Sequence, residues 1–120
     1  MRLPIVLLPA LLVAGCYSVD EIRERPVVWS ANYAAPYDEL TNCVVAQTAR
    51  DYAPVPQIYP REKRAIVTVS LKTSPTILSE YAIQEVAPNV SRVDYRKAPS
   101  VFNQDGSGGR IVADRCAKTQ

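Results

Sequence analysis

The sequence predicts a small α+β domain, in which an antiparallel sheet of three or four strands carries a helix at 36–52 and a short C-terminal helix on one face. Two observations predict this class. Apolar and polar residues alternate in short runs separated by turn segments, which is typical of an antiparallel meander. Between the first two of these runs, apolar residues recur at helical spacing instead.

The first two elements are a short strand and the helix. The strand at 27–33 alternates β-branched and aromatic residues with polar ones, so one of its faces is apolar. Pro36 suits the first helical position because its φ is already close to the helical value, and Asp38 and Glu39 suit the positive end of the helix. The predicted buried stripe of the helix consists of Tyr37, Leu40, Val44 and Tyr52.

The middle of the chain is predicted to contain one connection and three strands. Prolines punctuate 53–60, and because proline disrupts helix and strand alike, we expect an exposed connection there. The clearest strand is 65–71, where every second residue is apolar. Strands at 77–86 and 90–97 follow after short turns and complete the meander.

The C-terminal segment at 110–117 permits two interpretations. It follows a flexible, glycine-containing loop at 99–109. Val112 and Cys116 have helical spacing and Ser107 can cap a helix, which favours a short helix. The pair Ile111-Val112 is the alternative signal, for a last edge strand.

The first fifteen residues have the pattern of a secretory signal: Arg2, then an uncharged apolar run, then the small residues Ala14 and Gly15. The apolar run is roughly a dozen residues long and contains Pro4 and Pro9, so it falls short of the ~20 apolar residues that cross a bilayer. An ordinary cleaved signal and an uncleaved interfacial helix are both compatible with this pattern.

The leader ends on LVAGC, residues 12–16, which resembles the lipobox of bacterial lipoproteins. The resemblance implies that residues 1–15 are a signal peptide and that Cys16 receives a diacylglycerol and then a further acyl chain such as palmitate. Two or three chains anchor a protein stably, whereas one holds it only marginally. Tyr17 stands where an aspartate would retain an enteric lipoprotein at the inner membrane, so the resemblance favours the outer membrane, with the domain facing the periplasm.

Residues 16–26 are polar and charged without a clear period, and we expect a lipidated tether for a single periplasmic-type domain at 27–120. The other two cysteines, Cys43 and Cys116, are expected to form a disulfide because the periplasm is oxidising. Closing a loop of about 73 residues would stabilise the domain by ~4 kcal/mol. Two free thiols are the alternative, and a redox-active pair is disfavoured because the chain has no Cys-x-x-Cys spacing.

Composition limits the possible functions. The 14 basic and 12 acidic residues give a net charge of +2, which argues against a nucleic-acid binder. The chain has no histidine, which excludes Ser-His and Cys-His nucleophile pairs and imidazole zinc sites. The GSGG stretch at 106–109 lacks the Lys-Ser/Thr of a phosphate loop. We therefore expect no nucleic acid, no metal, no cofactor and no enzymatic activity.

Two functions are left open. In the first, the protein is a non-catalytic envelope lipoprotein that binds another envelope protein or helps maintain the envelope. Its contact surface is then the uncovered sheet face. The mature domain resembles small proteobacterial lipoproteins with one helical and one C-terminal cysteine. In the second, the domain binds or cleaves cell-wall glycan through carboxylates. Glu80 and Glu85 lie an odd number of residues apart and are expected on opposite faces of a strand, which disfavours cleavage. Arg92, Arg96 and Lys97 form a candidate basic strip for anionic lipid or acidic glycan, although a solvated strand face has the same composition.

Overall fold

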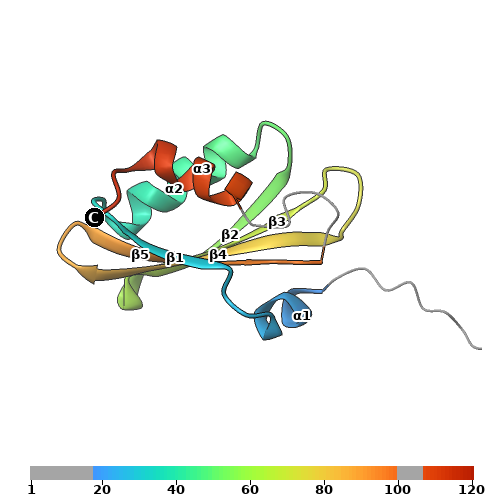
Figure 1. Cartoon of the computed structure of the whole chain (residues 1–120), viewed down its shortest axis with the longest axis horizontal. Helices are drawn as coiled ribbons and strands as arrows, with labels where there is room; N and C mark the ends of the chain where they lie inside the picture. The colour runs from blue at the N-terminus through green and yellow to red at the C-terminus, as the bar shows by residue number, and fades with distance from the viewer. Residues whose placement is uncertain (1–17, 100–106) are drawn as a thin grey trace, which may run out of the picture.

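The chain folds into a five-stranded antiparallel sheet with helices on both faces. The computed structural model describes residues 18–99 and 107–120. The strand order is β1-β5-β4-β3-β2, and Figure 1 shows α2 and α3 together on one face of the sheet with α1 on the opposite side. The elements are α1 (Val19–Glu24), β1 (Trp29–Tyr33), α2 (Tyr37–Thr48), β2 (Ala53–Tyr59), the 3₁₀ turn η1 (Pro60–Glu62), β3 (Arg64–Ser70), β4 (Ile77–Ala87), β5 (Val90–Lys97) and α3 (Ser107–Cys116).

The α+β class is confirmed. The sheet has five strands rather than the predicted three or four, because β2 was not predicted as a strand. The proline-punctuated segment, predicted as an exposed connection, lies at the sheet edge and pairs antiparallel with β3. Pro54 lies opposite Val69, and Pro56 lies opposite Val67. An edge strand tolerates proline because its missing N–H can face away from the ladder. The same missing donors make this edge a poor template for a further strand.

The other predicted strands are confirmed. β3, β4 and β5 each lie within one residue of the predicted bounds. β1 begins at Trp29 rather than at position 27, and Val27 and Val28 are exposed before it. Because β1 and β2 occupy opposite edges of the sheet, α2 crosses the sheet face between them.

Helix α2 confirms the predicted helix but ends before the predicted bound at 52. Leu40 and Val44 of the predicted stripe are 1% and 0% exposed. Tyr52 lies beyond the helix and is exposed, because its N–H bonds the Thr48 carbonyl in a turn that reverses the chain into β2. Tertiary structure therefore shortens the helix: the chain must turn before position 53 to reach the sheet edge.

Helix α3 confirms the helical interpretation of the C-terminal segment. It lies beside α2, and the predicted disulfide between Cys43 and Cys116 joins the two helices with a Cα–Cα distance of 5.7 Å. Ala113 is fully buried, and the Tyr81 hydroxyl donates to the Gly109 carbonyl at 3.1 Å. The two predicted helices thus cover the same sheet face, as expected.

Three aromatic rings form the centre of the core under α3. Tyr95 stacks on Trp29 with ring centroids 5.2 Å apart, and Tyr81 meets Tyr95 edge to face at 5.0 Å. The register places these three side chains directly opposite one another on neighbouring strands, so they share one face of the sheet. Around them, the buried core consists of Tyr33, Ala35, Leu40, Val44, Val67, Val69, Ile83, Val93 and Ala113.

The segment predicted as an irregular tether contains helix α1. Ser18 caps this helix by accepting a hydrogen bond from the Glu21 N–H at 3.3 Å. Ile22 is fully buried, and α1 packs against β4 and β5. A helix of six residues with a single buried apolar residue has no measurable period, which explains why the pattern of the sequence did not predict it.

Candidate functional site

The sheet face opposite α2 and α3 is the candidate contact surface. Beyond the part that α1 covers, this face carries polar side chains from β1, β4 and β5. The Asp94 carboxylate accepts hydrogen bonds from the Ser30 hydroxyl and from Arg92 Nε, the latter at 2.9 Å. On β1, β4 and β5 the polar groups of this face are therefore largely paired with one another, whereas the register also places Val55 and Tyr59 of β2 on it, and Val55 is 58% exposed. Among its exposed and half-exposed polar members are Ser30, Asn32, Gln84, Arg92 and Asp94.

The predicted basic strip is divided between the two faces of β5. Arg92 pairs with Asp94, and Arg96 Nε donates to the Arg25 carbonyl at 3.1 Å. Lys97 shares the face of Tyr95 by strand alternation and is only 9% exposed. No continuous cationic strip therefore forms along β5.

The two carboxylates of β4 lie on opposite faces of the sheet, as predicted. Glu80 lies under α1, is 2% exposed and forms an ion pair with Arg23 at 3.5 Å. Glu85 lies on the α2 side, where it accepts a hydrogen bond from the Tyr37 N–H at 3.1 Å. Glycosidases need two carboxyl groups on either side of one bond, roughly 5 to 9.5 Å apart. This pair has no such arrangement, because the sheet lies between its members.

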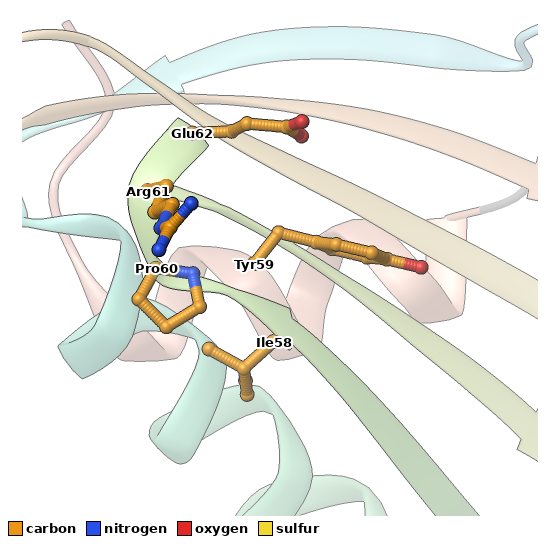
Figure 2. Close-up of a pocket in the computed structure, with 5 residues that line it drawn as sticks. All are labelled: Ile58, Tyr59, Pro60, Arg61 and Glu62. Carbon is orange, nitrogen blue, oxygen red and sulfur yellow. The ribbon is translucent and has the colours of Figure 1, made fainter.

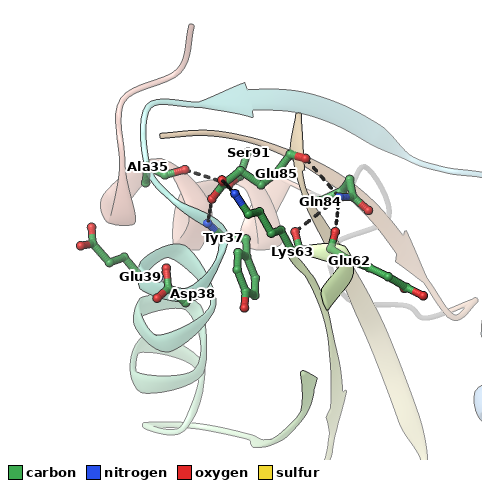
Figure 3. Close-up of polar contacts among 9 residues, drawn as sticks. All are labelled: Ala35, Tyr37, Asp38, Glu39, Glu62, Lys63, Gln84, Glu85 and Ser91. Atoms are coloured by element: carbon green, nitrogen blue, oxygen red, sulfur yellow. Dashed lines mark hydrogen bonds and ion pairs between the residues drawn. The ribbon is translucent and has the colours of Figure 1, made fainter. Parts of the chain in front are cut away.

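Glu85 has a structural role at the start of α2, which Figure 3 shows. Pro36, the N-cap residue of α2, makes no side-chain capping bond, and the carboxylate of Glu85 takes that position from β4. A negative charge is favourable at this end of a helix. Lys63 lies 3.7 Å from the other carboxylate oxygen of Glu85. No local pattern predicts this cap, since Glu85 and Tyr37 are 48 residues apart.

A shallow, open hollow lies where β2 meets η1, and Figure 2 shows the side chains around it. The Arg64 guanidinium lies 4.0 Å from the centre of the neighbouring Tyr59 ring and also pairs with Glu62. Among the lining residues, Glu62 is the sole carboxylate. The hollow is lined by Ile58, Tyr59, Pro60, Arg61 and Glu62.

A second open hollow lies along the outer edge of β1. There the C-terminal residues extend the sheet for a short distance: the Gln120 N–H donates to the Asn32 carbonyl at 2.8 Å. The side chains of the lining residues include one cation, Arg92, and no Asp or Glu. The hollow is lined by Ser30, Ala31, Asn32, Val86, Arg92 and Gln120.

Cys16, the predicted lipid attachment point, lies outside the described residues, as do the proposed signal peptide and Tyr17. Within residues 18–99 and 107–120, no cluster of three or more His, Cys, Asp and Glu side chains is placed to hold a metal ion. No helix among these residues combines the length and apolar character needed to span a bilayer.

Burial perturbs three tyrosines in the core. It raises the pKa of Tyr33, Tyr81 and Tyr95 above the usual value of about 10. For Tyr33, the hydrogen bond that its hydroxyl donates to Asp114 at 2.7 Å raises the pKa further, since it is made only by the protonated form. All three rings belong to the buried core cluster, so the raised pKa values follow from their place in the core.

We expect the free energy of unfolding to fall as the pH rises above about 10. In the unfolded chain the three tyrosines ionise near pH 10, whereas in the folded protein they stay protonated, so the folded state binds more protons there. The stabilisation is complete below pH 10 and is lost towards the raised pKa of the folded state. Urea unfolding between pH 8 and pH 12 measures this, with Tyr33→Phe as the control that weakens the pH dependence. A midpoint that stays constant to pH 12 would contradict it.

The fold and its surfaces define a small, disulfide-linked α+β domain with a partly open sheet face. Comparison of the chain with models of known protein families, with curated proteins and with solved structures finds no match. Its function must therefore be argued from its own residues.

Proposed function

We propose that the protein is a lipoprotein of the bacterial cell envelope, anchored through Cys16 and facing the periplasm, with a non-catalytic role in binding another envelope protein or in envelope maintenance. The observation that carries the proposal is the pairing of the cysteines. The chain has three, and the structure joins Cys43 to Cys116. That disulfide fits an oxidising compartment. Cys16 is the one cysteine of the three that this disulfide does not use, and in the sequence it ends an apolar leader.

A non-catalytic role is supported by the arrangement of the acidic groups. The hollow beside Tyr59 has one carboxylate side chain in its lining, and the hollow along β1 has no Asp or Glu. Glu80 and Glu85 are separated by the sheet. Carboxylate-dependent cleavage of glycan, the alternative function, therefore gains no support from these hollows or from this pair of carboxylates. An outer-membrane location rests on Tyr17 following the acylated cysteine.

We expect Cys16→Ser to remove the protein from the detergent phase in Triton X-114 partitioning, or to leave it as an unprocessed precursor. Loss of the acyl chains removes the main source of membrane affinity, which amounts to ~0.8 kcal/mol for each buried CH₂ group. Mild crosslinking of the same cells, followed by affinity capture, tests the binding role: the wild type should recover an envelope protein that the variant does not.

The control is the double variant Cys43→Ala/Cys116→Ala, which loses the disulfide but keeps Cys16. It should still be processed and enter the detergent phase. If Cys16→Ser partitions and is processed like the wild type, the lipid anchor is refuted. If the wild type crosslinks to no envelope protein, the binding role loses its support.

A further inference from the structure

Helix α1 belongs to the folded domain rather than to a free tether. Its apolar contact is Ile22, which is 0% exposed against β4 and β5. Next to it, Arg23 Nε lies 3.5 Å from the carboxylate of Glu80, which is 2% exposed beneath the helix. Burying an acidic group is costly unless a cation pairs with it, and in the docked position of α1 Arg23 offsets part of that cost for Glu80.

The segment after α1 is also attached to the sheet. The Arg25 side chain donates to the Lys97 carbonyl at 3.3 Å, and the Arg25 carbonyl accepts from Arg96 Nε at 3.1 Å. Further along, the Val28 N–H donates to the Tyr95 carbonyl at 2.7 Å. The chain is therefore held against the sheet from the cap of α1 to the start of β1.

This attachment leaves little chain between the domain and the proposed anchor. Cys16 is two positions before Ser18, the N-cap of α1. Two residues of extended chain span at most ~7 Å. The polar headgroup layer on each side of a bilayer has about the same thickness, on the order of 6 Å. A lipid on Cys16 would therefore bring the start of α1 into contact with the headgroups.

We propose that the lipidated protein rests directly on the bilayer through one end of its sheet, formed by α1 and the exposed residues Val27 and Val28. The inference rests on the proposed lipidation of Cys16. Val27 and Val28 are 37% and 38% exposed, and apolar side chains at this position gain stability by entering the interface. The layer of α2 and α3 lies on the opposite side of the sheet from α1 (Figure 1), so these two helices take no part in the contact.

Trypsin tests whether α1 is docked. Arg23 precedes Glu24 and is a trypsin site, whereas Pro26 protects the bond after Arg25. With the lipidated protein in vesicles of phosphatidylethanolamine and phosphatidylglycerol, we expect slow cleavage after Arg23. In Ile22→Asp the helix should undock, and cleavage after Arg23 should be at least about tenfold faster and release the domain from the vesicles.

Val86→Asp is the matched control for this test, because Val86 is an exposed valine at the far end of β4. It should be cleaved after Arg23 at the rate of the wild type. If the wild type is cleaved after Arg23 as fast as Ile22→Asp, α1 is a free tether and the inference is overturned.

Fluorescence quenching tests the contact with lipid. Val27→Trp and Val86→Trp are each compared with the wild type, which contains Trp29 alone, in vesicles that include brominated phosphatidylcholine. We expect the tryptophan at position 27 to be quenched more strongly than that at 86, and the difference to disappear when Ile22→Asp is added. Equal quenching at the two positions would overturn the membrane contact.

The two proposals fail in different ways. If Cys16 is not acylated, the wild type partitions into the aqueous phase and neither tryptophan is quenched, while protection of Arg23 in solution still reports the docking of α1. If the protein is acylated but the two tryptophans are quenched equally, the anchor stands and the contact through α1 is refuted.

Discussion

Reducing the Cys43–Cys116 disulfide is expected to lower the free energy of unfolding by about 4 kcal/mol. The two cysteines are 73 positions apart, and the entropy that a crosslink removes from the unfolded chain increases with the logarithm of loop length. Domains typically have a total stability of about 5–15 kcal/mol, so this loss is a large share. Urea unfolding of the oxidised and the reduced protein measures the difference.

The double variant Cys43→Ala/Cys116→Ala provides the control. It should unfold close to the midpoint of the reduced wild type and should not respond to reductant. Replacing both residues avoids a single thiol that can pair with Cys16. Equal midpoints for the oxidised and reduced wild type would contradict the predicted stabilisation.

Gly109→Ala is expected to lower the free energy of unfolding by about 1–3 kcal/mol, which is typical of overpacking in a core. A Cβ at position 109 would lie 2.5 Å from two carbon atoms of the Tyr95 ring. That ring has little freedom to move, because it stacks on Trp29 and meets Tyr81 edge to face. Helix α3 must therefore shift away from the sheet. Thermal or urea unfolding measures the effect.

Gly108→Ala is the matched control, since Gly108 precedes Gly109 in the same helix and is half-exposed. Alanine is favoured over glycine within a helix by up to about 1 kcal/mol, so this variant should be as stable as the wild type or more stable. If Gly109→Ala is no less stable than Gly108→Ala, the close approach of α3 to Tyr95 does not limit the packing.

Local patterns account for the elements that the sequence predicted well. β3, β4 and β5 are each specified by alternation of apolar and polar residues, since a strand with one buried face needs that pattern wherever it lies. The start of α2 is marked by Pro36 followed by two acidic residues, and these signals act within one helical turn. The disulfide was predictable because only two cysteines remain once Cys16 is assigned to the lipid.

The features that the sequence did not predict depend on contacts between distant segments. Prolines at 54 and 56 are compatible with a loop or an edge strand, and pairing with β3 selects the strand. Helix α1 exists because one apolar residue, Ile22, is buried against β4 and β5. Glu85 caps α2 across 48 residues.

Patterns among neighbouring residues and the count of cysteines were enough to predict the α+β class, the meander, both helices of the covered face and the disulfide. The lipid anchor stays a proposal from the same kind of local pattern. The fifth strand, the cap at Glu85 and the docking of α1 depend on contacts that form once the chain has folded. The physical reason is that burial and hydrogen bonding between segments far apart in the chain outweigh weak local preferences. The proposed contact with the membrane follows from that docking, which leaves one residue, Tyr17, between Cys16 and the N-cap Ser18.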